Sequence, residues 1–312
     1  MGVSIDRPSA EVVVDEALVR RLLNDQFPEP AHLPVTLVGA GWDNVIHRVG
    51  TDLLIRVPRR EAAAQLILNE QRWLPVLAPR LPLAIPVPTH AGRATSYFPW
   101  AWTVAPWFVG APAAVNPPDD LMVAAEDLAA FVNALHVPAP TDAPHNPVRG
   151  GPHAERLDRI TARIIAVAES GRLPDSADPA ALVELWRTLA AAPVYDGPPL
   201  WMHGDLHALN IITRDDRLCA VIDFGDITAG DPATDLAVGW ILFDAPSRAR
   251  FHALVDVDDA TWTRAMAWAT SFAVMYLGAG TEDAAMDRMG RFTLAQVLHD
   301  VGEQPAFGAN TP

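Results

Sequence analysis

Cysteine is nearly absent from this sequence, which has only Cys219 in 312 residues. A single thiol cannot form an internal disulfide or a paired-cysteine metal site, and this agrees with a reducing compartment. The apolar residues around it, in LCAVI, favour a buried strand thiol over a nucleophile. The functional groups are therefore expected elsewhere in the chain.

The sequence also lacks long apolar runs and the features of a secretory signal. Runs such as 194–202 are interrupted by proline, glycine or charge, and they fall well below the roughly 20 residues that span a bilayer. Acidic residues begin at Asp6, and the chain does not open with a basic segment followed by an apolar one. We therefore expect a cytoplasmic protein that does not interact with a membrane.

Basic side chains are few compared with acidic ones. The chain has 23 basic and 38 acidic side chains, for a formal net charge of −15. Such a surface repels phosphate backbones, which argues against a nucleic-acid partner. The same charge would attract a polycationic small molecule, although solubility alone can explain an acidic composition.

The apolar pattern divides the chain into two parts, as its length also favours. From Val35, the run VTLVGAGWDNVIHRVGTDLLIRVPRR predicts three consecutive antiparallel strands separated by glycine turns. An amphipathic helix is expected before these strands and another over Glu61–Leu77. Proline and asparagine after Gly110 mark a linker, so we predict a nucleotide-binding lobe over 1–109 and a catalytic, acceptor-binding lobe over 110–312.

Beyond this linker the pattern is mainly helical, with short strands between Leu200 and Phe224. Helices are predicted over Asp119–Leu135, His153–Ala168, Ala177–Ala192, Asp235–Phe243, Asp259–Leu277 and Thr281–Leu298.

The densest group of polar residues in an apolar setting is WMHGDLHALNII, followed by VIDFGDITAGDPATDLA. Phosphoryl transfer needs positioning, a group that accepts the hydroxyl proton, and cations that neutralise the phosphates. Asp205 can orient or deprotonate a hydroxyl. Asn210 and Asp223 offer hard oxygen ligands to Mg²⁺, which takes few protein ligands in addition to phosphate oxygens. These three residues therefore predict phosphoryl transfer to a hydroxyl.

The order HGDxxxxN, IDFGD and GDPxxDLA resembles the aminoglycoside phosphotransferase family, relatives of protein kinases. The resemblance covers most of the chain. It implies an α+β, bilobal protein-kinase-like fold, with an N-terminal antiparallel sheet lobe that has one key helix and a larger, mainly helical C-terminal lobe. Asp205 would be the catalytic base, and Asn210 and Asp223 would bind Mg²⁺. His203 would shape the loop and Asp235 would brace it from below, although Asp235 also has the features of a helix N-cap.

The N-terminal half is expected to bind ATP or GTP as the phosphate donor. Gly39, Gly41 and Asn44 lie in a turn between two strands, where backbone N–H groups can approach phosphates. In the third strand the family usually has a lysine, and this chain has Arg56. Arginine keeps the charge and can bind phosphate through two donors, but its planar fork is not equivalent to an ammonium. Its expected partner is Glu70 on the following helix.

The segment WTVAPWFVG resembles the part of the family that contacts adenine. Pro106 has a carbonyl but no N–H, whereas Phe108 has both, so these two residues are the candidates for contacts to the base. The same aromatic residues can also serve lobe packing. The acceptor pocket is expected near Asp259–Leu277, where acids precede a helix with several aromatic residues.

The predicted function is therefore Mg²⁺-dependent transfer of a nucleotide γ-phosphate to a hydroxyl of an aminoglycoside-like or other antibiotic. A metabolite kinase acting on a sugar, amino alcohol or amino acid is the alternative with the same motifs. Arg56 in place of lysine also leaves open a nucleotide-binding pseudokinase. His203 and His207, in HxDxH, leave open a metallohydrolase. The oligomeric state is not predicted.

Overall fold

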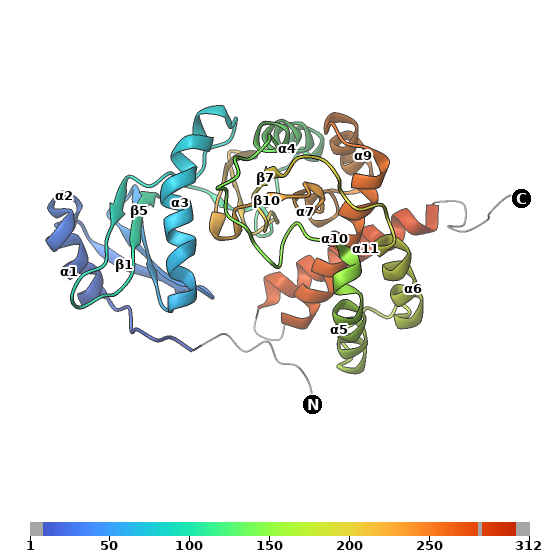
Figure 1. Ribbon diagram of the computed structural model, residues 1–312, viewed down its shortest axis with the longest axis horizontal. Helices are drawn as coiled ribbons and strands as arrows, with labels where there is room; N and C mark the ends of the chain where they lie inside the picture. The colour runs from blue at the N-terminus through green and yellow to red at the C-terminus, as the bar shows by residue number, and fades with distance from the viewer. Residues whose placement is uncertain (1–8, 280–282, 304–312) are drawn as a thin grey trace, which may run out of the picture.

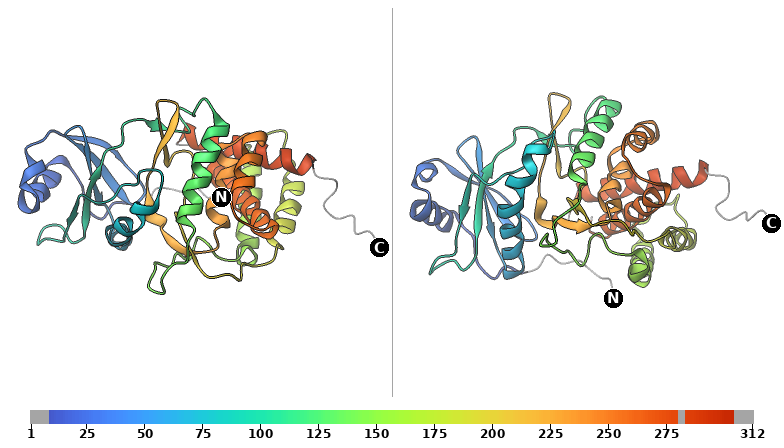
Figure 2. Two further views of the ribbon diagram at one scale, coloured as in Figure 1. Left: turned by 90° about the horizontal axis from the view of Figure 1, so that it is seen from above. Right: turned by 45° about the horizontal axis from the view of Figure 1, so that its top comes forward.

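The computed structural model describes residues 9–279 and 283–303, and it has two lobes that lie side by side (Figure 1, Figure 2). The smaller lobe is built on an antiparallel sheet of five strands in the order β1-β2-β3-β5-β4. These strands are β1 (Val35–Ala40), β2 (Asn44–Val49), β3 (Leu53–Pro58), β4 (His90–Gly92) and β5 (Trp102–Pro106). The three consecutive strands predicted from the sequence are confirmed.

Helices cover the two sides of this sheet. Helices α1 (Glu16–Gln26) and α2 (Pro28–Ala31) lie on the outer side, whereas α3 (Ala64–Leu77) lies between the sheet and the larger lobe (Figure 1). Apolar residues of α1 are fully buried in one core with the inner residues of the sheet. The helix predicted over Glu61–Leu77 begins as a 3-10 turn, η1 (Glu61–Ala63), and η2 (Ala78–Arg80) follows it.

The larger lobe is mainly helical, as predicted. Its helices and 3-10 turns are α4 (Leu121–Leu135), η3 (His153–Arg156), α5 (Leu157–Glu169), α6 (Pro179–Ala190), η4 (Phe224–Asp226), α7 (Ala233–Leu236), α8 (Val238–Leu242), α9 (Ala245–Leu254), α10 (Asp259–Ala279) and α11 (Ala284–Glu303). Strands β6 (Ala111–Pro112), β8 (Ile211–Arg214) and β9 (Arg217–Val221) form one small sheet, and β7 (Leu200–Met202) pairs with β10 (Thr228–Gly230) in another.

Three parts of the larger lobe differ from the sequence prediction. Helix α9 was not predicted, because its residues show no clear apolar stripe; it begins where the Asp244 carboxylate accepts a hydrogen bond from the Ser247 N–H at 3.0 Å. The helix predicted over Asp235–Phe243 is divided into α7 and α8. Helix α11 begins at Ala284, and Thr281 and Glu282 lie outside the described residues.

The buried apolar residues form two cores, one for each lobe. Helix α3 lies between β3 and β4 in sequence, yet its residues Trp73, Leu74 and Leu77 are part of the larger core. Burial of these side chains fixes α3 to the larger lobe. The Gln71 amide donates to the Trp102 carbonyl of β5 at 2.9 Å, so this helix connects the larger core to the smaller lobe's sheet. Within the described part of the chain, none of the helices has the length and apolar character needed to span a bilayer.

We expect Leu74→Ala to destabilise the protein strongly, because Leu74 is fully buried whereas Leu68, on the same helix, is 45% exposed. Truncation of a buried leucine leaves a cavity and lowers the free energy of unfolding by about 2–5 kcal/mol, whereas an exposed one costs about 0.5 kcal/mol or less. Urea unfolding of Leu74→Ala and Leu68→Ala measures the difference. Equal losses in the two variants would show that α3 is not anchored in the larger core through Leu74.

Candidate active site

A buried carboxylate holds the loop that follows β7. The two oxygens of Asp235, which is fully buried, accept hydrogen bonds from the backbone N–H of His203 at 2.7 Å and of Gly204 at 2.8 Å. Asp235 lies within α7 and not before it, so its interpretation as a helix N-cap is wrong. Its carboxylate instead satisfies two buried donors of the loop, and leaving them unpaired would cost free energy.

Gly204 allows the same loop to turn sharply. Its φ is 85°, in the left-handed region, and a Cβ at this position would lie 2.4 Å from the carbonyl oxygen of Asp226. Only glycine accommodates both the dihedral angle and this close approach. The loop of residues 203–210 is therefore held against η4.

The His203 ring connects the loop to the strand beside it. Its Nδ1 accepts a hydrogen bond from the Asp205 N–H at 3.2 Å, and its Nε2 is 2.9 Å from the carbonyl oxygen of Ile222. The ring also contacts Phe224, with centroids 4.4 Å apart. Both ring nitrogens of His203 are thus engaged in hydrogen bonds within the protein, which gives the metal-ligand interpretation of this residue no support.

Asp205 lies between two nitrogen donors. One carboxylate oxygen accepts a hydrogen bond from the Arg149 guanidinium at 3.0 Å, and the other is 3.3 Å from Nε2 of His207. The Nδ1 of His207 accepts from the Leu209 N–H at 3.2 Å, which places its proton on the nitrogen that faces Asp205. Burial by itself would raise the pKa of Asp205, but His207 and Arg149 outweigh it and lower the pKa below its usual range. The carboxylate is therefore ionised at neutral pH.

Arg149 was not identified from the sequence, because it belongs to an irregular segment with no motif. Its guanidinium also contacts the carboxylate of Asp226 at 3.0 Å, so it bridges two acids. The side-chain amide of Asn146 donates a second hydrogen bond to Asp226 at 2.8 Å. The segment before η3 thus closes over the loop of Asp205 from one side.

Asn210 and Asp223 are brought together by the hairpin of β8 and β9. Ile211 pairs with Val221, and the Ile222 N–H donates to the Asn210 carbonyl at 2.8 Å, so the two residues lie at the same end of the hairpin. The Asn210 amide nitrogen donates to the Asp205 carbonyl at 3.0 Å, which leaves its oxygen for another partner.

Asp223 is presented to the space between the lobes. Its backbone is left-handed, with φ 62°, and its side chain is 55% exposed. A carboxylate and an amide oxygen at one end of a hairpin fit Mg²⁺, which binds through one or two protein oxygens and the phosphates of a substrate. The described residues contain no group of three or more His, Cys, Asp or Glu side chains that could hold a metal by themselves.

Arg56 connects the smaller lobe to this site. Its guanidinium contacts both carboxylate oxygens of Glu70 on α3 at 2.7 Å and the carboxylate of Asp223 at 2.9 Å. The pair predicted between Arg56 and Glu70 is present, and it is buried. Burial raises the pKa of Glu70, and the positive charge of Arg56 opposes this rise. Contacts at 2.7 Å from Arg56 to both Glu70 oxygens fit an ionised pair. Burial would lower the pKa of Arg56, but Glu70 and Asp223 raise it above its ordinary value.

The other predicted nucleotide contacts lie in the smaller lobe and at its edge. Gly39 ends a β-bulge in β1, and the Gly41 N–H donates to the Asn44 carbonyl at 2.8 Å, which closes the turn. The Asn44 side chain is buried, and its oxygen has no hydrogen-bond partner among the described residues. A Cβ at Gly39 would have no other atom within 4 Å, so packing does not require glycine at this position.

Pro106 and Phe108 lie where the chain passes from one lobe to the other. Pro106 ends β5, and the backbone N–H between them, that of Trp107, is engaged with the Asp52 carbonyl at 2.8 Å. In the described chain no partner accepts from the Phe108 N–H. Among the described residues, no hydrogen bond joins the five residues Gly39, Gly41, Asn44, Pro106 and Phe108 to Asp205, Asn210 or Asp223.

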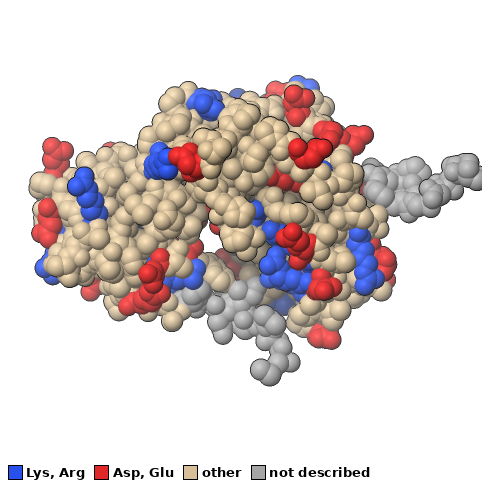
Figure 3. Space-filling view, in the orientation of Figure 1, with Lys and Arg blue, Asp and Glu red and all other residues tan. Residues whose placement is uncertain are grey.

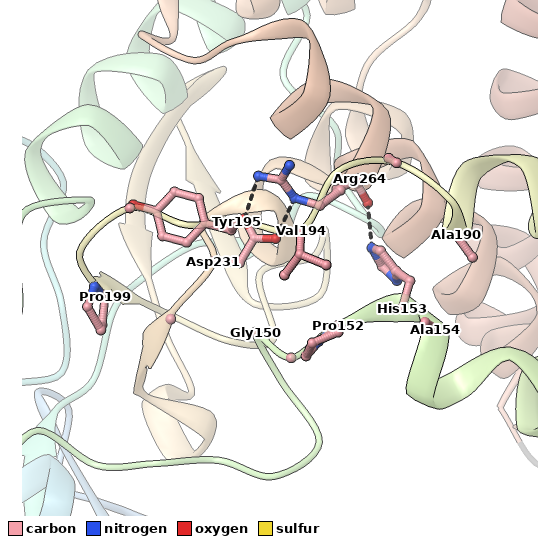
Figure 4. Close-up of a pocket in the computed structure, with 14 residues that line it drawn as sticks. Gly150, Pro152, His153, Ala154, Ala190, Val194, Tyr195, Pro199, Asp231 and Arg264 are labelled. Atoms are coloured by element: carbon pink, nitrogen blue, oxygen red, sulfur yellow. Dashed lines mark hydrogen bonds and ion pairs between the residues drawn. The ribbon is translucent and has the colours of Figure 1, made fainter.

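A cavity of about 240 Å³ lies in the larger lobe and is lined in part by residues 150–154, which follow Arg149 in the chain (Figure 4). Gly150, Gly230 and residues 190–199 form much of its wall, and none of the predicted site residues lines it. Arg264 spans its polar side, where the guanidinium contacts Asp231 at 2.7 Å (Figure 4). This cavity is therefore separate from the site of Asp205, Asn210 and Asp223.

Fold and site together define the protein-kinase-like class: a sheet lobe with one key helix, a helical lobe, and an Asp, Asn and Asp set on consecutive loops. The model of the phosphotransferase enzyme family, APH, matches residues 34–268. The chain belongs to this family of kinase-type phosphotransferases. No curated protein is matched.

Several solved structures are similar to the whole chain. A GDP complex of aminoglycoside 2'-phosphotransferase-IIIa has 18% identity and a TM-score of 0.67, covering 92% of this chain and 100% of that one. A macrolide 2'-phosphotransferase from Brachybacterium faecium has 20% identity and a TM-score of 0.57, covering 89% and 97%. A macrolide 2'-phosphotransferase type I has 19% identity and a TM-score of 0.59, covering 90% and 99%. At these identities the likeness concerns the fold.

We expect His153, at the cavity, to make the protein less stable in mild acid. Burial lowers the pKa of His153 to about 4, against a hydrogen bond to the Arg264 carbonyl that favours the charged ring. A lowered histidine pKa means that stability is complete above the ordinary pKa near 6.5 and is lost as the pH falls toward 4. Urea unfolding between pH 7 and 4 should show a loss of roughly 3 kcal/mol from this residue.

The control is His153→Phe, which keeps an aromatic ring between Trp186 and Trp268 and cannot be protonated. Its free energy of unfolding should be lower than that of the wild type at pH 7 but should fall less between pH 7 and 4. An unchanged difference between the two proteins over this range would contradict the prediction.

Proposed function

We propose that this chain is an O-phosphotransferase that transfers the γ-phosphate of ATP or GTP to a hydroxyl of a small molecule. The observation that supports it best is the meeting of Asp205, Asn210 and Asp223 at one end of a hairpin, with Arg56 bonded to Asp223 from the other lobe. The division into a nucleotide-binding lobe, 1–109, and a catalytic lobe, 110–312, is part of the proposal, as is a cytoplasmic location.

Asp205 acts as the catalytic base in this proposal. Its ionised carboxylate accepts a hydrogen bond from the acceptor hydroxyl and so aims the oxygen at the γ-phosphorus. The new O–P bond forms as the bond to the β–γ bridging oxygen breaks, the nucleoside diphosphate leaves, and the hydroxyl proton passes to Asp205. A low pKa suits a loose transition state, in which orientation matters more than early proton removal.

His203 and Asp235 position this carboxylate by holding the loop, as their hydrogen bonds indicate. Asn210 and Asp223 would hold Mg²⁺, which when bound neutralises the charge of the phosphate oxygens. Arg56, held by Glu70, would face the phosphates from β3 in the role usually taken by lysine. A cation at position 56 that faces the phosphates, together with an ionised Asp205, favours an active enzyme over a pseudokinase.

The remaining nucleotide contacts would be made by residues of the smaller lobe and of the segment that leaves it. The turn of Gly39 and Gly41 and the amide of Asn44 would approach the phosphates. The Pro106 carbonyl and the free N–H of Phe108 would bind the base. The nucleotide complexes of similar structures, with GDP or ADP, support a nucleotide donor.

An aminoglycoside-like or other antibiotic is the acceptor class proposed from the sequence. Structurally similar proteins include complexes with kanamycin, streptomycin and gentamicin, and also macrolide phosphotransferases. A metabolite kinase is the second candidate, and the arginines of η3 and α5 beside the site favour it. A mass-shift screen of pooled antibiotics and metabolites with ATP and Mg²⁺ looks for the gain of one phosphoryl group.

We expect Asp205→Asn to lower kcat for phosphoryl transfer by about 10²–10⁴, because the amide cannot accept the proton. The KM for the nucleotide should change little, since Asp205 faces the acceptor. Asp216→Asn, the same substitution at an exposed turn, is the matched control and should keep full activity. Transfer by Asp205→Asn at the wild-type rate would remove Asp205 from the role of base.

We expect Arg56→Lys to keep part of the activity and Arg56→Gln to lose most of it. Lysine retains the charge, but one ammonium does not reproduce the fork that contacts Glu70 and Asp223 together. A loss of about tenfold in kcat/KM for the nucleotide is expected for lysine, and a larger one for glutamine. Steady-state kinetics with varied ATP measures both. Equal activity of all three proteins would show that position 56 does not act on the phosphates.

A further inference from the structure

Four arginines gather on the larger lobe beside the site. Arg149 precedes η3, Arg156 ends η3, and Arg159 and Arg163 follow on α5. Positions 156, 159 and 163 are spaced by three and four residues, so they share one helical face. In Figure 3, basic side chains of this lobe border the hollow between the lobes, with acidic side chains beside them.

Three of these arginines, Arg156, Arg159 and Arg163, lack acidic partners among the described residues, whereas Arg149 is paired with Asp205 and Asp226. Arg156 is only 6% exposed, yet it makes no hydrogen bond or ion pair with any described residue, and its guanidinium lies 4.3 Å from the centre of the Trp268 ring. Arg159 and Arg163 likewise have no such partner in the described chain. Burial lowers the pKa of Arg156 to about 10, and its cationic neighbours Arg159 and Arg149 add to this effect.

Unpaired cations are unexpected in a chain with 38 acidic and 23 basic side chains. Arg156 is the buried member of the three, and a buried charge costs free energy unless it is paired. The neighbouring charges of Arg159, which is exposed, and Arg163, which is half-buried, raise this cost. The other buried arginines of the described chain are each paired with an acid: Arg56 with Glu70, Arg248 with Asp300 and Arg264 with Asp231. The missing countercharge on this face is therefore supplied most simply by a ligand.

Aromatic residues of α10 connect this face to the reacting carboxylate. Trp268, Phe272 and Tyr276 follow at steps of four residues, with Trp268 against Arg156 and Phe272 5.3 Å from the guanidinium of Arg149. Arg149 in turn bonds to Asp205 at 3.0 Å. A molecule on the arginine face thus lies next to the position where Asp205 would receive a hydroxyl.

We propose that the acceptor carries an anionic group, a carboxylate or a phosphate ester, which binds to Arg156, Arg159 and Arg163 while its hydroxyl faces Asp205. This inference rests on the proposed phosphotransferase function and narrows its substrate to hydroxylated anions. Polycationic aminoglycosides would meet like charges on this face. The nucleotide is not the ligand meant here, because its predicted contacts lie on the smaller lobe and on the loops of Asn210 and Asp223.

The first experiment needs no knowledge of the acceptor. Inorganic phosphate, compared with chloride at equal ionic strength, should raise the Tm of the wild type, and Arg159→Gln/Arg163→Gln should lose this rise. Arg93→Gln, which removes one exposed arginine from the smaller lobe, should respond as the wild type does. The same Tm for the wild type in phosphate and chloride would overturn the inference. Arg156 is left intact because its side chain packs on Trp268.

The second experiment compares acceptors that differ in charge. Pools of hydroxy acids, sugar acids and sugar phosphates are tested with ATP and Mg²⁺ against matched neutral sugars, amino sugars and aminoglycosides. We expect phosphorylation of an anionic member, and a KM for it about tenfold higher for each arginine removed. Glucuronate and glucose 6-phosphate, against glucose, separate a carboxylate from a phosphate ester.

The outcomes separate the two proposals. Transfer mainly to cationic or neutral acceptors, unaffected by Arg159→Gln/Arg163→Gln, would overturn the anionic acceptor and leave the phosphotransferase intact. A Tm rise with phosphate that depends on these arginines, together with no Mg²⁺-dependent nucleotide turnover in any pool, would support the anion site and reject the proposed transfer reaction.

Discussion

The guanidinium of Arg56 joins the two lobes at the point where the chemistry is expected. It is bonded to Glu70 on α3 and to Asp223 beyond β9, so the strand, the helix and the loop meet at one cation. Helix α3 is in turn anchored in the larger core by Leu74 and Leu77. The β8–β9 hairpin places Asp223 near Asn210, and the contact with Arg56 holds the Asp223 carboxylate against the smaller lobe. All 23 basic side chains of the chain are arginine and none is lysine, so arginine at position 56 agrees with the whole composition.

Charge is distributed unevenly around the site. The chain is strongly acidic as a whole, yet Asp205 lies between Arg149 and His207 and is kept ionised by them. Arg149 also neutralises Asp226, so two nearby acids share one cation. Sharing has a cost at Asp226, where burial and the neighbouring charge of Asp205 raise the pKa of the carboxyl despite Arg149. Arg156 of η3 differs, because it is buried without an acidic partner among the described residues, and the inferred acceptor would supply that countercharge.

Much of the fold was predictable because its signals are local. Glycine turns between β-branched runs predict β1, β2 and β3, and the spacing of apolar residues predicts most of the helices. Helix α9 was missed because its burial comes from packing on α4 and not from an apolar stripe of its own. The N-cap interpretation of Asp235 was wrong for a related reason: the sequence shows a carboxylate near a helix start, whereas tertiary contacts decide that it accepts from His203 and Gly204.

The sequence by itself determined the family and the set of Asp205, Asn210 and Asp223. These residues lie close together in sequence, next to the ends of short strands, and the geometry of the strands and turns brings their side chains to one place. The tertiary structure alone decided what those residues contact. Arg149 reaches Asp205 across 56 positions, and Arg56 reaches Asp223 across 167. It also decided that three arginines of η3 and α5 lie together without acidic partners among the described residues. Contacts over such separations depend on how whole elements pack, which no local pattern of residues encodes.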